Sequence, residues 1–304
     1  MKNEKIKQKL IFDKIAFTLP VDKIYRMDLV EKLNDPDIYN SYKRKVYKTK
    51  SGRYKNNYQF TICNKKTIEI SIYPINTKHN FFRLEYNPTN LKKIGRKNMR
   101  TLLKMLIGLE KAKKIFFNAT ITRLDLTLDL FDMEPNLYIY KPRIKQSQIF
   151  RDGSCKKLNN ITSQIIGSDK SNIRITMYNK NLEQGKSSNL NNHQRIEIRL
   201  RNLQTSMADI KYLGEKLLIN FKELEFYGCD FLTDSFFSKE FKNNTREFGL
   251  NRALNSLDDN QRRYYRRHLQ SFRAYPIELG ELNFEKAHKI ALGSLLHPDY
   301  RHLS

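Results

Sequence analysis

Three short segments of this chain place an arginine two residues before a carboxylate. The arginines are Arg83, Arg123 and Arg195, and the acids that follow them are Glu85, Asp125 and Glu197. Residues two apart in a β-strand share a face, so each strand would present its arginine and its acid together. Carboxylates bind Mg²⁺ or Mn²⁺, and guanidinium groups hold phosphate oxygens by paired hydrogen bonds. The three segments therefore indicate metal-assisted cleavage of a phosphodiester.

A fourth segment offers a nucleophile. Residues 174–180 (RITMYNK) alternate in the same way and place Tyr178 between Arg174 and Lys180 on one predicted face. A phenol that attacks a phosphodiester conserves the bond energy as a phosphotyrosine, which permits later rejoining. Because a free phenol has a pKa of about 10, Tyr178 needs nearby cations or a metal. We expect Arg174 and Lys180 to stabilise its phenolate.

Other residues extend or compete with this site. Asp129 follows Asp125 on the same strand face and is an alternative metal ligand. Tyr264 and Tyr265 are competing nucleophiles. They lie in a basic run that we interpret as the DNA-binding surface of a helix, although a plain solvated face has the same pattern. The side chains expected to contact DNA are Arg83, Arg123, Arg195, Arg199, Arg262, Arg263, Arg266 and Arg267.

A structural alternative exists for each of these features. One arginine–acid pair on a strand is more typical of a solvated salt-bridge face than of a site. Tyr178 is one of 17 tyrosines in the chain, and most tyrosines pack as amphipathic side chains. The repetition of the pair, together with the tyrosine segment, favours a site over these alternatives.

The composition indicates a folded protein with a polyanionic partner. The chain has 304 residues, of which 39% are hydrophobic, and a formal charge of +25. A Lys-rich proteome explains abundant lysine but not this surplus, so nucleic acid is the favoured partner. Three widely spaced cysteines form neither a disulfide framework nor a zinc pattern, and no apolar run is long enough to span a membrane. We therefore expect a cytoplasmic protein.

The hydrophobic pattern predicts an α+β fold. It is an antiparallel sheet with helices packed on one face, followed by a mainly helical C-terminal part. The expected strands cover residues 10–19, 57–63, 67–75, 80–87, 119–131, 145–150, 161–166, 172–180 and 194–202. The expected helices cover residues 23–34, 89–114, 207–225, 239–255, 257–272 and 284–296. We expect a catalytic α+β domain over residues 1–205 and a helical region that binds DNA over residues 206–304.

The order of these motifs resembles that of a known group of proteins. An Arg-Leu-Asp strand, then RITMYNK followed by Glu183, then residues 195–200 (RIEIRL), is similar to rolling-circle replication initiators that lack the His-pair motif. These are the Rep_trans family of small Gram-positive plasmids and, more loosely, the gene II replication proteins of filamentous phages. The resemblance covers residues 10 to about 205. One departure is Asp169, which stands where the family commonly has arginine.

The resemblance implies a metal-dependent DNA endonuclease and strand transferase with topoisomerase-like nicking and closing. Such a protein nicks the plus-strand origin, stays attached to the 5′-phosphate through tyrosine and leaves a 3′-OH. The family's nucleophile matches Tyr178, and its acidic strand positions match Asp125 and Glu197, with Glu85 a weaker match. The implied partners are single- and double-stranded origin DNA, a host helicase and a second copy of the chain.

Other functions are compatible with parts of the pattern. A non-catalytic sequence-specific DNA-binding regulator of a mobile element would use the same basic surface. An RNA-binding factor would stack bases on aromatic residues of the sheet, but no RNP-like cluster supports this. Acidic residues on a nucleic-acid-facing surface repel phosphate unless a metal neutralises them, which argues against both. The sequence also lacks a P-loop and a His-x-His pair.

Overall fold

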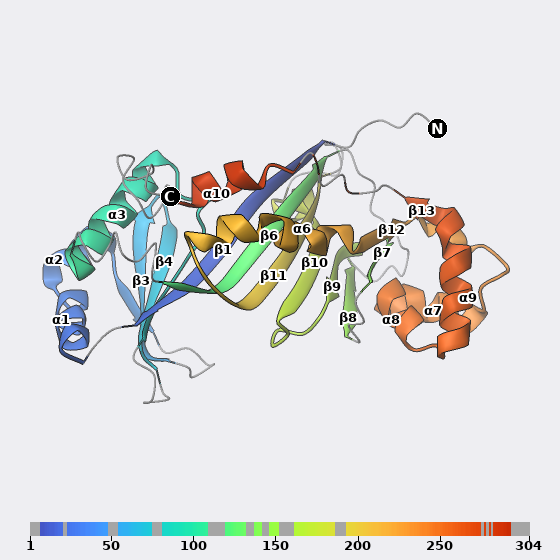
Figure 1. Cartoon of the computed structure of the whole chain (residues 1–304), viewed down its shortest axis with the longest axis horizontal. Coiled ribbons are helices and arrows are strands. Elements are labelled where there is room, and N and C mark those ends of the chain that lie inside the picture. The colour runs from blue at the N-terminus through green and yellow to red at the C-terminus, as the bar shows by residue number, and fades with distance from the viewer. Residues whose placement is uncertain are drawn as a thin grey trace. The chain divides into compact units, whose positions relative to one another are not determined.

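The chain forms two compact units that interleave along the sequence in a computed structural model (Figure 1). The α3 unit comprises residues 11–126, 200–214 and 284–304, and the α9 unit comprises residues 1–10, 127–199 and 215–283. The structure describes residues 7–20, 23–47, 54–74, 81–108, 119–131, 137–141, 146–151, 161–185, 193–274, 277, 280 and 282–292.

The α3 unit is built on antiparallel strands in the order β2-β3-β4-β5-β1-β6. These strands are β1 (Gln8–Pro20), β2 (Lys45–Tyr47), β3 (Tyr54–Cys63), β4 (Lys66–Pro74), β5 (Phe81–Tyr86) and the first half of β6 (Thr120–Phe131). In the β1–β5 pair, Ala16 is opposite Glu85 and Thr18 is opposite Arg83. The helices are α1 (Lys23–Leu33), α2 (Pro36–Tyr42), α3 (Lys93–Ile107) and α10 (Phe284–Leu292).

The α9 unit contains a second run of strands in the order β6-β11-β10-β9-β8. Their bounds are β8 (Ser147–Arg151), β9 (Ile161–Ile166), β10 (Ile173–Asn179) and β11 (His193–Ser206). A smaller sheet has the order β13-β12-β7, formed by β7 (Leu137–Tyr140), β12 (Leu224–Tyr227) and β13 (Arg273–Ala274). The helices are α5 (Lys180–Glu183), α6 (Gly214–Lys222), α7 (Lys239–Phe248), α8 (Leu250–Asn255) and α9 (Asp259–Leu269).

Strict alternation of leucine with polar residues explains why residues 120–131 form strand β6, which carries two of the predicted acids. Its leucines at positions 124, 126, 128 and 130 are at most 2% exposed. Burying one leucine side chain stabilises the fold by roughly 1.5–3 kcal/mol, so this face fixes the strand's register. The opposite face is also buried, because Asp125 and Asp129 are only 3% and 4% exposed. A carboxylate buried to this extent must be paired, and both are (below).

Helices α7, α8 and α9 share their own hydrophobic core with the small sheet. Its fully buried members include Tyr227, Phe231, Phe237, Phe241, Leu250, Leu254 and Leu269. The sequence predicts a single helix over residues 239–255, but the chain breaks it at Gly249. This residue has a φ of 90° and a ψ of 156°, a conformation that only glycine adopts readily. Two shorter helices therefore pack on the core where one was expected.

The α+β class and the antiparallel sheet are confirmed, as are the helices of the C-terminal part. The expected helix over 207–225 is wrong at both ends, because it contains a 3-10 helix at Asp209–Leu213 and runs into strand β12. Helix α2 and strands β2, β7 and β13 were not expected. Residues 109–114 and 293–296, at the ends of two expected helices, lie outside the described residues.

The division into a catalytic and a DNA-binding domain at residue 205 stays a prediction, and the compact units are assembled from segments that alternate along the chain. Strands β6 and β11 each pass from one unit into the other, so the units do not follow one another along the chain. Within the residues placed by the structure, no helix combines the length and apolarity that a membrane crossing requires.

Candidate functional site

Strand β10 ends immediately after Tyr178. Asn179 caps α5, since its side-chain oxygen accepts hydrogen bonds from the backbone amides of Asn181 and Leu182. Tyr178 is half-buried and lies opposite Ser163 of β9, so its ring points to the same side of the sheet as Thr176. The capped turn fixes where the strand stops and therefore where the phenol lies.

The hydroxyl of Tyr178 donates a hydrogen bond of 2.7 Å to Oε1 of Glu197 on β11. Burial raises the pKa of the phenol, and the hydrogen bond and negative charge of Glu197 raise it further. Arg195 opposes this effect with its positive charge and also hydrogen-bonds the tyrosine. The resting phenol is therefore protonated, and a carboxylate is already in place to accept its proton.

The two cations expected beside Tyr178 have other partners. Lys180 forms an ion pair of 2.5 Å with Glu183 inside α5, and its ammonium lies 5.5 Å from the centroid of the Tyr178 ring. Arg174 forms an ion pair with Asp169 in the turn before β10. Arg195 is the guanidinium that interacts with the phenol, so it replaces Arg174 as the phenolate-stabilising group in our interpretation.

Arg195 is held rigidly by Asp129. Its Nε and Nη2 donate to the two carboxylate oxygens at 2.6 and 2.8 Å, and Nε2 of His193 lies 3.0 Å from the same carboxylate. Burial favours the neutral form of Asp129, but the bonds and charge of Arg195 outweigh it and lower the pKa of this acid. The pKa of Arg195 is raised in return, since the pair outweighs its own burial. Asp129 thus orients the guanidinium that faces Tyr178.

The α3 unit contains a separate cluster of charges around Glu85. Lys14 approaches Oε1 of Glu85 at 2.6 Å, Arg83 bonds its other oxygen, and Arg123 lies 3.5 Å away. Arg123 also donates through Nε to Asp125 at 2.8 Å. Burial alone would raise the pKa of Glu85, but the cations around it lower this pKa to about 2. Both acids of this unit are therefore ion-paired in the folded chain.

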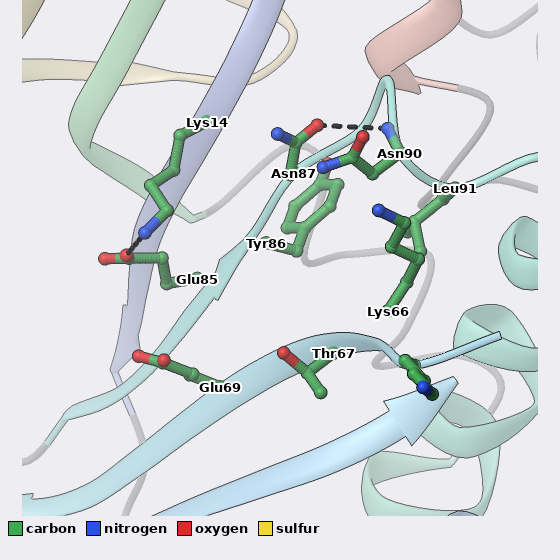
Figure 2. Close-up of a pocket in the computed structure, with 10 residues that line it drawn as sticks. Lys14, Lys66, Thr67, Glu69, Glu85, Tyr86, Asn87, Asn90 and Leu91 are labelled. Carbon is green, nitrogen blue, oxygen red and sulfur yellow. Dashed lines mark hydrogen bonds and ion pairs between the residues drawn. The ribbon is translucent and has the colours of Figure 1, made fainter. Parts of the chain in front are cut away.

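A hollow of about 240 Å³ lies beside this cluster, lined by Lys14, Lys65, Lys66, Thr67, Glu69, Glu85, Tyr86, Asn87, Asn90 and Leu91. Figure 2 shows Lys14 reaching from β1 to Glu85, with Glu69 on the adjacent strand β4. Asn87 closes the turn after β5, because its side-chain oxygen accepts from the backbone amides of Thr89 and Asn90. The hollow has both basic and acidic side chains on its wall.

The four predicted metal ligands are divided between the units. Glu85 and Asp125 belong to the α3 unit, and Glu197 and Asp129 belong to the α9 unit. Among the residues that the structure describes, no group of three or more His, Cys, Asp or Glu side chains is arranged to hold a metal. Mg²⁺ at phosphoryl-transfer sites commonly uses one or two carboxylates with waters and substrate oxygens. By this chemistry, Glu197 is the best-suited ligand beside Tyr178.

Helix α9 presents part of its basic run to solvent. Arg263, Tyr264 and Arg267 are exposed, and Tyr264 is 59% exposed. Arg266 is half-buried on the same helix. Of the four arginines expected to contact DNA here, two are exposed (Arg263 and Arg267) and two are half-buried (Arg262 and Arg266), so the basic run does not form one uniformly exposed face.

The remaining members of the run serve the helix itself. Arg262 is half-buried and forms an ion pair with Asp259, one turn earlier. The hydroxyl of Tyr265 accepts a hydrogen bond of 3.1 Å from the amide of Ser238. Tyr265 thus serves packing, which leaves Tyr264 as the accessible tyrosine of this pair.

Sequence reasoning missed Lys14, Asp169 and His193. His193 precedes Arg195 by two residues on the same strand, so the two side chains share a face and the sequence spacing could have indicated this. The expected strand, however, begins only at residue 194. Lys14 is a charged residue inside an apolar strand, which is a weak sign of a buried partner. Asp169 stands out in the sequence only as a departure from a family pattern. Its two arginine partners, Arg174 and Arg199, lie on neighbouring strands and could not be deduced from spacing.

Comparisons with known proteins give a similarity to solved structures. No protein-family model matches the sequence, and no curated protein matches it. Among solved structures, the chain is similar to the rolling circle replication initiator protein from Geobacillus stearothermophilus, with 16% sequence identity and a TM-score of 0.43. The match covers 90% of this chain and 99% of that chain.

Proposed function

We propose that this protein nicks and rejoins DNA through a covalent phosphotyrosine at Tyr178, and so initiates rolling-circle replication at the plus-strand origin of a plasmid or phage. The observation that carries the proposal is the hydrogen bond from the Tyr178 hydroxyl to Glu197, with Arg195 beside it. Glu197 is placed to accept the phenol proton, and Arg195 is placed to stabilise the phenolate. A nucleophile needs both.

The chemistry follows from these contacts. The phenol oxygen attacks the scissile phosphorus while its proton passes to Glu197, and the bond from phosphorus to the 3′-oxygen breaks. That oxygen leaves as a 3′-OH after taking a proton from water, and the 5′-phosphate stays on Tyr178. Arg195, held by Asp129, stabilises charge on the phenolate and on the phosphate oxygens. Rejoining is the reverse attack by a 3′-OH on the phosphotyrosine.

Metal dependence is part of the proposal. Mg²⁺ or Mn²⁺ bound at Glu197 would polarise the scissile phosphate. Glu197 then has two roles, as a proton acceptor and as a ligand, which is compatible with its two carboxylate oxygens. The ordered set of motifs in the sequence supports this assignment, because it pairs the tyrosine strand with an acidic strand.

A nicking assay tests the proposal directly. Supercoiled plasmid carrying the element's own origin is incubated with the full chain and Mg²⁺ or Mn²⁺. The parent should give nicked or relaxed product and a protein–5′-phosphate adduct, and a chelator should abolish both. Tyr178→Phe should give neither product nor adduct. Tyr264→Phe is the matched control, since this exposed tyrosine should be dispensable. Nicking that persists in Tyr178→Phe would refute the nucleophile.

A non-catalytic sequence-specific DNA-binding regulator is the second candidate. It is favoured by α8 and α9, which are joined by residues 256–258 and end in an exposed face with Arg263, Tyr264 and Arg267. A short turn between two such helices is typical of DNA-binding motifs whose second helix enters the major groove. Under both candidates, replacing Arg263 and Arg267 by alanine should weaken duplex binding. Only the regulator would be indifferent to Tyr178→Phe.

A further inference from the structure

A second hollow, of about 580 Å³, lies entirely within the α9 unit. Its wall combines the start of β8, the turn after β9, the start of β10 and helix α8. The lining side chains are mainly polar: Gln146, Ser147, Gln148, Ser168, Asp169, Arg174 and Arg252, with Ile165 and Gly167. Two arginines and several hydrogen-bonding groups around a hollow of this size are suited to an anionic ligand with polar edges.

The turn that forms one wall is rigid. Gly167 has a φ of 91°, and a Cβ there would lie 2.7 Å from the carbonyl oxygen of Ile173, so only glycine fits. Its amide donates to the carbonyl of Gln146 at 2.8 Å. The hydroxyls of Ser168 and Ser171 lie 3.0 Å apart and tie the turn together. The turn therefore holds the backbone of Asp169 at a fixed place on the rim.

Asp169 is an exposed acid that holds largely buried bases. Its side chain is 79% exposed, whereas those of Arg174 and Arg199 are 19% and 24% exposed. Arg174 is bonded to this carboxylate, and Arg199 lies 3.8 Å from it. The carboxylate thus occupies the position where the guanidinium of Arg174, which lines the hollow, would bind a phosphate oxygen. An incoming phosphate can displace it into solvent, since the Asp169 side chain is itself largely exposed and the arginine gains the phosphate as a new anionic partner.

Some of the side chains that line the hollow lie on the face of the sheet that carries Tyr178. Gln148 pairs with Ile165, which pairs with Thr176, and Phe150 pairs with Ser163, which pairs with Tyr178. Cross-strand partners share a face, so Phe150 lies on the tyrosine side. It is 48% exposed on β8, at the edge of the strand order. Arg174 precedes Tyr178 by four residues, or about 13 Å along the strand.

We propose that this hollow and Phe150 form a subsite for single-stranded DNA beside the nucleophile. A backbone phosphate displaces the Asp169 carboxylate and binds Arg174 and Arg252, and an unstacked base packs on Phe150. Arg252 is positioned for this by its cation–π contact with Phe248 of α7, whose ring centroid is 4.1 Å from the guanidinium carbon. The inference rests on the proposed function for the direction of the strand, which runs toward Tyr178.

Binding of labelled oligonucleotides tests the subsite separately from catalysis. The full chain carrying Tyr178→Phe, which cannot form the covalent bond, is titrated into fluorescent single-stranded or duplex DNA, and anisotropy is followed at several salt concentrations. Phe150→Ala should weaken single-strand binding by about tenfold, the usual effect of losing one stacked base. Phe150→Tyr should restore it. Arg252→Ala should weaken binding and reduce the salt slope by roughly 0.7, the value for one single-strand phosphate.

Asp169→Asn should change the single-strand affinity in the opposite direction. A residue with a merely structural role would not strengthen binding when it is replaced. It should tighten single-strand binding several-fold, because the competing charge is gone. Lys216→Ala and Tyr212→Ala are controls for charge and for exposed aromatic area, and should leave binding unchanged. The subsite is refuted if Asp169→Asn and Arg252→Ala bind like these controls, or if all variants affect duplex and single strand equally. If binding changes as expected but the parent does not nick, the subsite stands and the proposed function fails.

Discussion

The hydroxyl of Tyr178 faces a carboxylate and a guanidinium, which have opposite effects on its pKa. Burial and Glu197 raise the pKa, and Arg195 lowers it. The sequence predicted cationic neighbours from alternation along one strand. Lys180 is such a neighbour, because its ammonium lies 5.5 Å from the centroid of the Tyr178 ring, whereas Arg174 pairs with Asp169. The residues that contact the phenol come from β11, two positions apart and on the same face.

Replacing Glu197 by glutamine should lower the pKa of Tyr178 toward the ordinary value of about 10, because the negative charge that disfavours the phenolate is removed. Carbon-13 NMR of labelled tyrosine, with Tyr178→Phe used to assign the signal, measures this directly. Glu183→Gln is the matched control and should have a smaller effect, since Glu183 contributes less to the raised pKa. An unchanged Tyr178 signal in Glu197→Gln would contradict the hydrogen bond.

Glu85 should make the free energy of unfolding depend on pH in the acidic range. Its pKa is about 2 in the folded chain, below the ordinary value of about 4.3. A lowered pKa contributes stability above the unfolded value, and this stability is lost as pH falls from about 4.3 to 2. Glu85→Gln should therefore reduce the free energy of unfolding at pH 7 by up to about 3 kcal/mol, and by much less at pH 2. Urea unfolding at several pH values tests this.

The exposed Glu31 of α1 is the control for that experiment. Glu31→Gln should change the free energy of unfolding little at either pH, because an exposed charge contributes little. Equal pH profiles for Glu85→Gln and the parent would show that the ion pairs around Glu85 do not stabilise the fold.

At the scale of elements, alternation and helical spacing predicted most of the sheet and α3. They failed where one residue overrides the local pattern. Gly249 divides an expected helix into α7 and α8, and Asn179 stops β10 by capping the next turn. Both overrides position candidate functional groups. The first sets the angle of the helices before α9, and the second fixes the end of the tyrosine strand.

Gly249→Ala should destabilise the protein by about 1–3 kcal/mol, the cost of placing a side chain in this backbone conformation. The added Cβ would also lie 3.3 Å from Cγ1 of Ile149. Thermal and urea unfolding measure the loss. Gly108→Ala is a useful comparison, since Gly108 has a φ of 76° but no atom within 4 Å of its Cβ position. A stable Gly249→Ala protein would argue against the break as a structural requirement.

At the scale of the molecule, the net charge of +25 is the property that most strongly indicates a polyanionic partner. A polyanion neutralised by many cations releases counterions, so the logarithm of the affinity falls linearly with the logarithm of the salt concentration. This effect is additive over many weak contacts and does not need any one residue. It therefore acts over both units and is independent of the chemistry at Tyr178.

The affinity for duplex DNA should fall by about 10³-fold or more between 50 and 200 mM salt if six or more phosphates are contacted. Fluorescence anisotropy over this range gives the slope. The double variant with Arg263→Ala and Arg267→Ala should reduce the slope by about 2, whereas Lys216→Ala should not change it. A flat salt dependence would contradict the interpretation of the net charge.

The sequence by itself determined the α+β class, the basic character and the strand faces on which the acids, arginines and Tyr178 lie. These properties follow from composition and from local periodicity, which act over a few residues. The tertiary structure decided which charges meet. It placed Glu197 and Arg195 against Tyr178, paired Arg195 with Asp129, and paired Arg174 with Asp169. The physical reason is that strand order and register bring together residues distant in sequence, and electrostatic pairing depends on distances that periodicity does not contain.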